Sequence, residues 1–133
     1  QCALLGHGTA GDIQAGDQHT FFTGKAHSGS SFLIKKEKYI YDKLYNRAYA
    51  YDFTFNNKII EFNGDYWHCN PNIFSSDYFN SVKQKTANEI WDYDKRKKEC
   101  AEEYNNKVLI IWEYDYNTNK EQTIQKCIEF LES

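Results

Sequence analysis

The chain has little of several features that define common protein classes. Methionine is absent, and proline occurs once, at Pro71. The four cysteines are scattered and form no CxxC pair, which excludes a small disulfide framework and favours reduced thiols in an intracellular protein. The longest apolar run, 108–112, is far too short to span a membrane, and no secretory signal is evident. We therefore expect no membrane partner.

Composition sets the outer bounds. The 133 residues are 41% hydrophobic and 26% charged, which is typical of one globular domain with a real core. Because the chain begins with Gln1 and lacks methionine, we expect a fragment or a processed product. Six of the seven glycines and three of the four histidines lie within residues 1–30, which we interpret as a loop-rich arm or the tail of a preceding domain.

Charge gives two opposing indications. The net charge of −3 argues mildly against a dedicated nucleic-acid binder. Basic residues nevertheless cluster at 35–38, at Lys83 and Lys85, and at 95–98. The last cluster falls on a predicted helix, where it would contact phosphates or form a solvated helix face, and both interpretations stay open. Weak intrinsic binding would suit a domain that another domain targets.

A β-hairpin is predicted in the middle of the chain. Two runs rich in aromatic and β-branched residues, 49–55 and 58–63, are separated by a pair of asparagines. Asparagine tolerates the positive φ of a tight two-residue turn, and such a turn sets Asp52 directly opposite Glu61. Alternation along the strands gives an apolar face and an acidic face, namely Tyr51, Phe53, Phe55, Ile60 and Phe62 against Asp52, Thr54, Ile59, Glu61 and Asn63.

The opposed acids have two interpretations. Directly facing carboxylates repel each other and destabilise a strand pair. A divalent cation between Asp52 and Glu61 would turn this repulsion into ligation, and Mg²⁺ prefers such hard oxygen ligands. Alternatively, both acids are solvated on an exposed face, where water and salt screen their charges.

The residues after Glu61 gather polar and aromatic side chains at one strand end. Gly64 lets the strand break sharply, and Pro71 indicates that a loop follows. Between them lie an acid, two large aromatics and a histidine: Asp65, Tyr66, Trp67 and His68. A lone histidine is more often a surface residue, and paired aromatics more often pack in a core. Their concentration at one strand end favours a functional site.

The remaining patterns predict helices and one apolar strand. A first helix is expected over 34–46, with a buried side made of Ile40, Leu44 and Tyr45, and a second over 82–104 after a long loop. Residues 107–113 are nearly all apolar, as a central buried strand would be. Thr118 and Glu121 have the spacing of a capping box for a last helix, whose apolar stripe is Ile124, Cys127, Ile128 and Leu131. This order predicts an α/β fold with a mixed central β-sheet flanked by helices.

The run 60–68, Ile-Glu-Phe-Asn-Gly-Asp-Tyr-Trp-His, resembles the strand-end motif of the Vsr-like nucleases. This group includes very short patch repair endonucleases and phage-type homing endonucleases, and belongs to the PD-(D/E)xK superfamily. Asp52 stands where the superfamily has its strand aspartate, and 88–98 followed by 107–113 resembles the group's helix and closing strand. The resemblance implies a restriction-endonuclease-like core and a nuclease catalytic domain over 31–133.

The resemblance assigns catalytic roles residue by residue. It implies that Asp52 and Glu61 bind Mg²⁺, for which Mn²⁺ can substitute, and that His68 is the general base or positions the water. Asn63 and Asp65 would support these residues. Asn63 stands where the superfamily signature has lysine, which transfers the activation of the nucleophile to His68.

Other residues would contact DNA. Tyr66 and Trp67 match aromatics that lie against the DNA base stack in the repair enzymes. Lys95 and the second-rank candidate Asp94 are accessory contacts on the later helix. Glu37 matches an acid that approaches the site through water in relatives, although a solvated glutamate within a charge run is the favoured alternative.

The sequence therefore predicts a Mg²⁺-dependent endonuclease acting on double-stranded DNA, in a bacterial cytoplasm or a phage-infected host cell. A homing or mobile-element enzyme with a fused or separate DNA-targeting domain is favoured over a mismatch-repair nicking endonuclease. The reason is that no zinc is expected, since no ligand set at zinc spacing accompanies Cys69. The alternatives are a non-catalytic nucleic-acid or protein-binding module on a decayed nuclease fold, which the missing lysine favours, and a structure-selective or RNA-directed nuclease.

Overall fold

A computed structural model describes the backbone of residues 7–8, 11–15, 21–25 and 31–133, and the side chains of residues 38–133. The first half consists of strands, namely β1 (His7–Gly8), β2 (Gly11–Ala15), β3 (Phe21–Lys25), β4 (Ser31–Asp42), β5 (Arg47–Phe55) and β6 (Lys58–Asn63). The second half adds β7 (Phe79–Asn80), β8 (Lys85–Thr86), α1 (Ala87–Glu103), β9 (Lys107–Trp112), α2 (Glu113–Thr118) and α3 (Lys120–Glu132).

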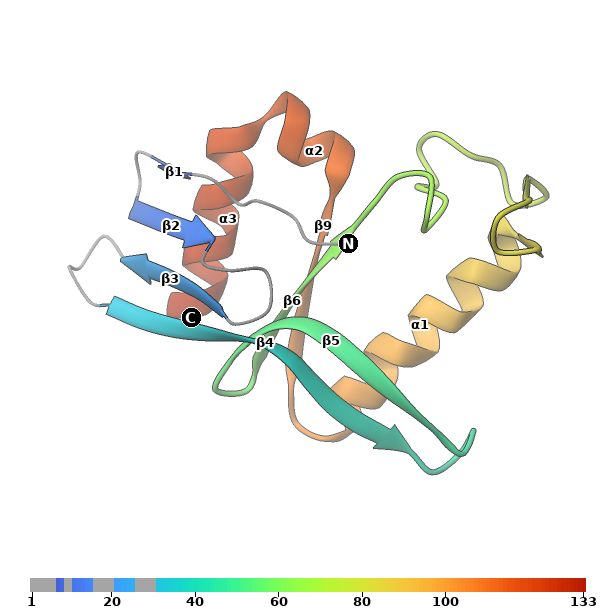
Figure 1. The fold of residues 1–133 in the computed structure, drawn as a ribbon, viewed down its shortest axis with the longest axis horizontal. Helices are drawn as coiled ribbons and strands as arrows, with labels where there is room; N and C mark the ends of the chain where they lie inside the picture. Colours follow the sequence, from blue (N-terminus) through green and yellow to red (C-terminus); the bar gives the residue numbers. More distant parts are fainter. Residues whose placement is uncertain (1–6, 9–10, 16–20, 26–30) are drawn as a thin grey trace.

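Within these residues, seven strands form one mixed sheet in the order β1-β2-β3-β4-β5-β6-β9. Neighbours from β1 to β6 are antiparallel, whereas β9 runs parallel to β6. Strands β7 and β8 form a separate pair beside the start of α1. The predicted α/β fold with a mixed central sheet and flanking helices is confirmed (Figure 1).

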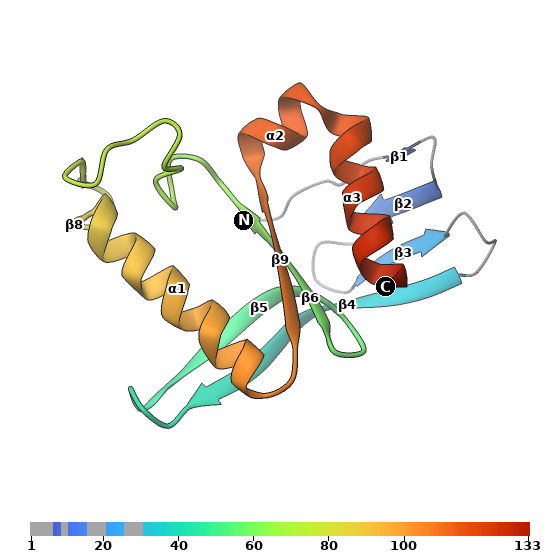
Figure 2. The same ribbon diagram turned by 180° about the vertical axis from the view of Figure 1, so that it is seen from behind.

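The two long helices cover opposite faces of the sheet. On β6, the neighbouring residues Ile59 and Ile60 point to opposite sides, as alternation along a strand requires. Ile59 packs against Cys100 and Ala101 of α1, while Ile60 packs against α3. Figure 2 shows β9 between the two helices. The predicted apolar stripe of the last helix is confirmed, because each of its members is buried against the sheet, namely Ile124, Cys127, Ile128 and Leu131.

The apolar strand β9 is not central, so that part of the prediction is wrong. It is the last strand in the sheet order and pairs with β6 along its whole length. Its hydrophobic run has another cause: Val108 packs toward α1, and Ile111 packs toward α3. A strand covered by helices on both faces needs apolar residues on both faces, even at the edge of a sheet.

The helix expected over 34–46 is wrong, because these residues form most of β4 and the turn after it. Exposure alternates along the strand: Tyr39 is 65% exposed, Ile40 8% and Tyr41 49%. Leu44 and Tyr45 lie in the turn and are exposed rather than buried. The pairing of β4 with β5 over seven residue pairs supplies hydrogen bonds between distant segments, which local helix propensity does not take into account.

The segment expected to be a loop-rich arm contributes strands to the same sheet. Strand β3 pairs with the first residues of β4, and β2 and β1 continue the sheet beyond β3. Residues 1–6, 9–10, 16–20 and 26–30 lie outside the described part of the chain. Whether 1–30 belongs to a separate domain stays a prediction.

Helix boundaries differ from the expected ones at two places. The second helix starts at Ala87 instead of residue 82, after a capping box in which Thr86 and Glu89 bond reciprocally. The capping box expected at Thr118 is wrong, because Thr118 ends α2 and its hydroxyl donates to the Tyr114 carbonyl. In the described part of the chain, no helix combines the length and apolar character needed to cross a membrane.

Candidate active site

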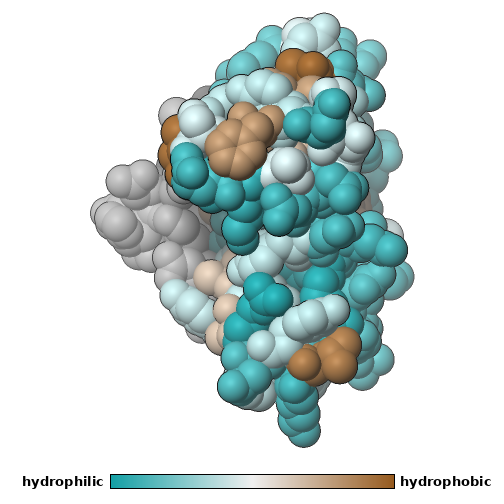
Figure 3. Space-filling model, turned by 90° about the vertical axis from the view of Figure 1, so that its right-hand side faces the viewer, coloured by the Kyte–Doolittle hydropathy of each residue, from teal (hydrophilic) through white to brown (hydrophobic). Residues whose placement is uncertain are grey.

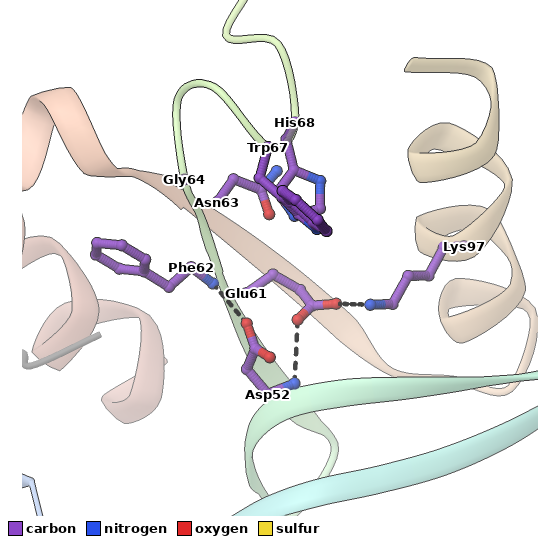
Figure 4. Close-up of a pocket in the computed structure, with 8 residues that line it drawn as sticks. All are labelled: Asp52, Glu61, Phe62, Asn63, Gly64, Trp67, His68 and Lys97. Carbon is purple, nitrogen blue, oxygen red and sulfur yellow. Dashed lines mark hydrogen bonds and ion pairs between the residues drawn. The ribbon is translucent and has the colours of Figure 1, made fainter. Parts of the chain in front are cut away.

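A cavity of about 360 Å³ opens where β6 ends. Three parts of the chain line it: β5 with Asp52, the end of β6 with the loop after it, and α1 with Lys97. Figure 4 shows these side chains converging, with Trp67 and His68 above the two acids and Lys97 reaching in from the helix. The lining residues are Asp52, Glu61, Phe62, Asn63, Gly64, Trp67, His68 and Lys97.

The two acids meet at the point where the ladder between β5 and β6 stops. Backbone pairing runs from Phe55–Lys58 to Phe53–Ile60, as the Asn-Asn turn predicts. One residue further, carboxylates replace carbonyl oxygens as acceptors. The Asp52 N–H donates to Glu61 Oε2 at 3.0 Å, and the Phe62 N–H donates to Asp52 Oδ2 at 3.0 Å. The predicted juxtaposition of Asp52 and Glu61 is therefore present, with each acid bonded to the opposite strand.

One predicted face assignment is wrong at this point. Tyr51 was expected beside Phe53, but Tyr51 packs with Tyr49 on the α1 side and Phe53 packs on the α3 side. The Tyr51 hydroxyl donates to the Lys97 carbonyl at 2.6 Å, which ties this part of β5 to α1. The register with β4 is the same before and after Asp52, so the change of side occurs without an inserted residue.

Glu61 is a buried carboxylate beside a second acid. Burial, and after it the charge of Asp52, raise the pKa of Glu61, and although Lys97 opposes both effects the resulting pKa is about 8. Lys97 Nζ lies 2.6 Å from Glu61 Oε1. Even with the lysine in place, burial and the neighbouring acid therefore disfavour the charged form of Glu61.

His68 is held in position from two directions. Its Nδ1 lies 2.8 Å from Asp94 Oδ2 on α1, and both side chains are mostly buried. Its backbone N–H donates to the Gly64 carbonyl at 3.0 Å, which closes the turn after β6. Because a carboxylate accepts hydrogen bonds, this contact selects the tautomer of the neutral ring that has its proton on Nδ1 and its lone pair on Nε2. Asp94, a second-rank candidate, thus orients His68.

Asp65 has a different position from the one expected of a supporting catalytic group. Its carboxylate accepts hydrogen bonds from the Asn70 side chain at 2.9 Å and from the Tyr114 N–H at 3.3 Å. Its own N–H donates to Glu113 Oε1 at 3.1 Å. These bonds fasten the loop after β6 to the start of α2 and do not place the Asp65 carboxylate in the lining of the cavity.

The two predicted DNA-contacting aromatics lie at the surface. Tyr66 and Trp67 are both partly exposed, and Trp67 also lines the cavity. The Tyr66 ring packs edge-on against Phe74 at 6.2 Å, and the ammonium of Lys83 lies 5.0 Å from the centroid of the Trp67 ring. Exposed rings supported from behind by other side chains are able to meet a ligand without unfolding the loop.

Of the two remaining predicted site residues, Lys95 is not among the residues that line the cavity. The Lys95 side chain is 75% exposed, and its Nζ lies 3.8 Å from Glu99 Oε2 on the same helix. Glu37 is in β4 rather than in a helix, and the register on either side places it across from Asp52. Its side chain is outside the described part of the chain.

Lys97 is the site residue that sequence reasoning missed. A signal was present, because Ile90, Asp94, Lys97 and Ala101 follow each other at spacings of four, three and four residues on one helix face. Ile90 and Ala101 are buried members of that face. Two charged residues inside an otherwise buried stripe indicate that the helix covers a polar site.

The residues present fit a hard divalent cation. Asp52 and Glu61 supply carboxylate oxygens inside the cavity, and the raised pKa of Glu61 shows that added positive charge would relieve their repulsion. Among the described side chains, no cluster of three or more histidine, cysteine or acidic residues surrounds one point. Magnesium usually keeps several waters and needs one or two carboxylates, so two acids are compatible with it. The absence of zinc near Cys69 stays a prediction.

Comparisons of the chain with protein-family models, with curated proteins and with solved structures give no match. The resemblance to Vsr-like nucleases therefore rests on the motif residues, and the assignment of function rests on the geometry of the cavity.

Proposed function

We propose that this chain is a Mg²⁺-dependent endonuclease domain with a Vsr-like PD-(D/E)xK core, acting on double-stranded DNA inside the cell. One observation carries the proposal: a single cavity joins Asp52 and the buried Glu61, the cation Lys97, and a histidine oriented by Asp94. Hydrolysis of a phosphodiester needs these functions together, namely neutralisation of charge on the phosphate and a base for the attacking water.

The two acids would hold the metal. When bound, Mg²⁺ polarises the phosphate and lowers the pKa of the attacking water. Asp52 and Glu61 are already fixed by hydrogen bonds from the opposite strands, so their oxygens need little reorganisation to bind a cation. Asn63 is buried, lines the same cavity and borders the space that the phosphate would enter.

His68 would act as the general base. Its Nδ1 proton is engaged by Asp94, so its Nε2 accepts a proton from the water as the new O–P bond forms. The bond from phosphorus to the leaving oxygen breaks, and this oxygen keeps the electron pair and takes up a proton from water. The Asp94 carboxylate stabilises the imidazolium that His68 becomes when it takes the proton of the attacking water. With His68 as the base and Asp94 as its partner, activation of the water does not need a lysine at position 63.

The presence of Lys97 favours a catalytically active nuclease site over a decayed one. The signature lysine is absent from β6, where Asn63 stands, yet an ammonium group lies at 2.6 Å from Glu61 Oε1. An ammonium at this position is able to stabilise negative charge that develops on the phosphate oxygens. The net charge of −3 fits a catalytic domain of a homing or mobile-element enzyme that a fused or separate domain targets to DNA.

The test is cleavage of supercoiled plasmid with Mg²⁺ or Mn²⁺. We expect cutting by the wild-type protein and loss of cutting in Asp52→Asn and His68→Ala. Asp92→Asn is the matched control for the first variant, because it makes the same chemical change at an exposed position of α1.

Cutting that survives in Asp52→Asn would refute the site assignment. If no metal supports cutting and none raises the melting temperature, the chain is a binding module on a decayed fold, because a bound cation stabilises the native state. If the protein cuts only RNA or only branched DNA in the presence of metal, that nucleic acid is the substrate instead of double-stranded DNA.

A further inference from the structure

A second cavity, of about 320 Å³, lies beside the candidate active site. It is formed by the segment before α1 and by the first half of that helix, and its lining residues are Lys83, Lys85, Ile90, Tyr93 and Asp94. Asp94 separates the two cavities, because its carboxylate bonds to His68, which lines the first one. The two cavities therefore share a wall.

Two ammonium groups reach this second cavity, and each is held against an aromatic ring. Lys83 Nζ lies 5.0 Å from the centroid of the Trp67 ring, and Lys85 Nζ lies 5.8 Å from the centroid of the Tyr93 ring. Within the described residues, neither ammonium forms an ion pair with a carboxylate. The one acid in the lining, Asp94, is already bonded to His68.

The electrostatics of the second cavity favour an anion. Burial lowers the pKa of Lys83, the charge of Asp94 opposes this effect, and the charges of Lys85 and Lys97 make smaller contributions that lower the pKa. A lysine that loses hydration and gains cationic neighbours without a paired acid is stabilised by any anion that enters. Phosphate oxygens suit such a position, since each lysine offers up to three donors.

The position of the second cavity indicates which anion. In the proposed reaction, the scissile phosphate lies in the first cavity near His68 and Lys97. A DNA strand carries a further phosphate on either side of that one, so a basic cavity sharing a wall with the site lies where the strand continues. The side of the molecule with α1 is largely hydrophilic, with hydrophobic residues in separate patches, which suits a polar backbone rather than an apolar partner (Figure 3).

We propose that Lys83 and Lys85 bind a backbone phosphate of the cleaved DNA strand, next to the scissile phosphate, in the cavity behind Asp94. This inference rests on the proposed nuclease function. The two lysines are positioning residues: they fix the register of the strand relative to His68 and Trp67 and do not touch the reacting atoms. Tyr93 and Ile90 form the apolar wall on which the adjoining sugar would lie.

The test measures binding of a fluorescein-labelled duplex by anisotropy, in an Asp52→Asn background with Mg²⁺, so that the substrate stays intact and the contact between His68 and Asp94 is kept. We expect Lys83→Gln and Lys85→Gln each to weaken binding by roughly 5- to 10-fold at about 0.1 M salt. Each should also reduce the slope of log Kd against log salt by about 1, because one phosphate contact is lost. Lys83→Arg keeps the charge and should restore most of the affinity.

Lys120→Gln is the matched control. Lys120 also sits over a tyrosine ring, at 5.6 Å from the centroid of Tyr116, but belongs to α3 on the other side of the sheet. Its removal should leave affinity and salt slope unchanged. Thermal melting of each variant checks the fold, and if Lys83→Gln does not fold, Lys85→Gln and Lys83→Arg carry the test.

A second measurement locates the phosphate. Duplexes with a single neutral methylphosphonate at successive positions should include one position at which Lys85→Gln causes no further loss, since the contact is already gone. Wild-type affinity and salt slope in both glutamine variants would overturn the subsite and leave the nuclease proposal standing. A wild-type protein that neither binds duplex nor cuts plasmid would overturn both.

Discussion

Lys97 Nζ lies 2.6 Å from Glu61 Oε1, so the cation beside the buried acid comes from α1 and not from the strand that carries the acid. The helix is also joined to the neighbouring strand β5, through the Tyr51 hydroxyl and the Lys97 carbonyl. The position of this ammonium group therefore depends on how α1 packs on the sheet. Activity and packing of the helix should be linked through this residue.

Replacing Lys97 tests that link. We expect Lys97→Gln to reduce the cleavage rate by about 10²- to 10³-fold, the usual effect of removing one group that stabilises charge in a transition state. Lys95→Gln, two residues away, removes the same charge from an exposed side chain and should cleave like the wild type. The measurement is the plasmid-nicking rate of each variant at saturating Mg²⁺. Full activity in Lys97→Gln would show that the lysine has only a structural role.

The raised pKa of Glu61 gives a pH dependence with a defined sign. Its pKa is about 8 in the folded protein and 4.5 in the absence of these interactions, so folding favours the protonated form. The contribution to stability is complete below pH 4.5 and is lost as pH rises through 8. Melting temperatures in EDTA should therefore fall over this range, and Glu61→Gln should flatten that part of the curve.

Magnesium should reverse this trend. A cation bound by Asp52 and Glu61 favours the charged form of Glu61, so the metal-induced rise in melting temperature should grow as pH increases toward 8. The same titration in Asp52→Asn serves as control, because the charge of Asp52 is the second cause of the raised pKa. A rise independent of pH would place the metal elsewhere.

The contact between His68 and Asp94 makes a prediction about catalysis. Asp94→Asn should reduce kcat by about 10²- to 10⁴-fold, because an amide is able to hold the ring in the wrong tautomer. Metal binding should change little. The double variant with His68→Ala should be no slower than His68→Ala alone, since residues that act as a unit are not additive. Additive losses would contradict the proposed pairing.

A network outside the site makes a prediction about stability. Arg96 on α1 bonds to both carboxylate oxygens of the buried Asp42 at 2.8 Å, and the Tyr49 hydroxyl adds a third bond at 3.0 Å. Arg96→Gln leaves Asp42 without its charge partner, so the melting temperature should fall clearly, while Lys95→Gln should not change it.

The same network has a pH signature of opposite sign to that of Glu61. Hydrogen bonds from Arg96 hold the pKa of Asp42 well below its usual range. This stabilisation is present above the ordinary pKa of an aspartate, near 3.8, and is lost as pH falls through the lowered value. Acid unfolding of the wild type should therefore begin at lower pH than that of Arg96→Gln, as followed by circular dichroism.

The amino-acid sequence by itself determined the hairpin, the last helix and the motif around His68. The Asn-Asn turn sets the register, and the register alone brings Asp52 to Glu61. The stripe of α3 follows the helical period without interruption. These features depend on neighbours a few residues apart, so local patterns suffice to predict them.

Only the tertiary structure decided the rest. Residues 34–46 have enough helix-forming residues to suggest a helix, but they pair with β5 and β3, and those partners are distant in the chain. The apolar run of β9 reflects helices on both faces rather than a central position. Lys97 enters the site, and Lys95 does not, because packing of α1 on the sheet selects which face of the helix meets Glu61. Contacts between distant segments decide these positions, and no local pattern contains them.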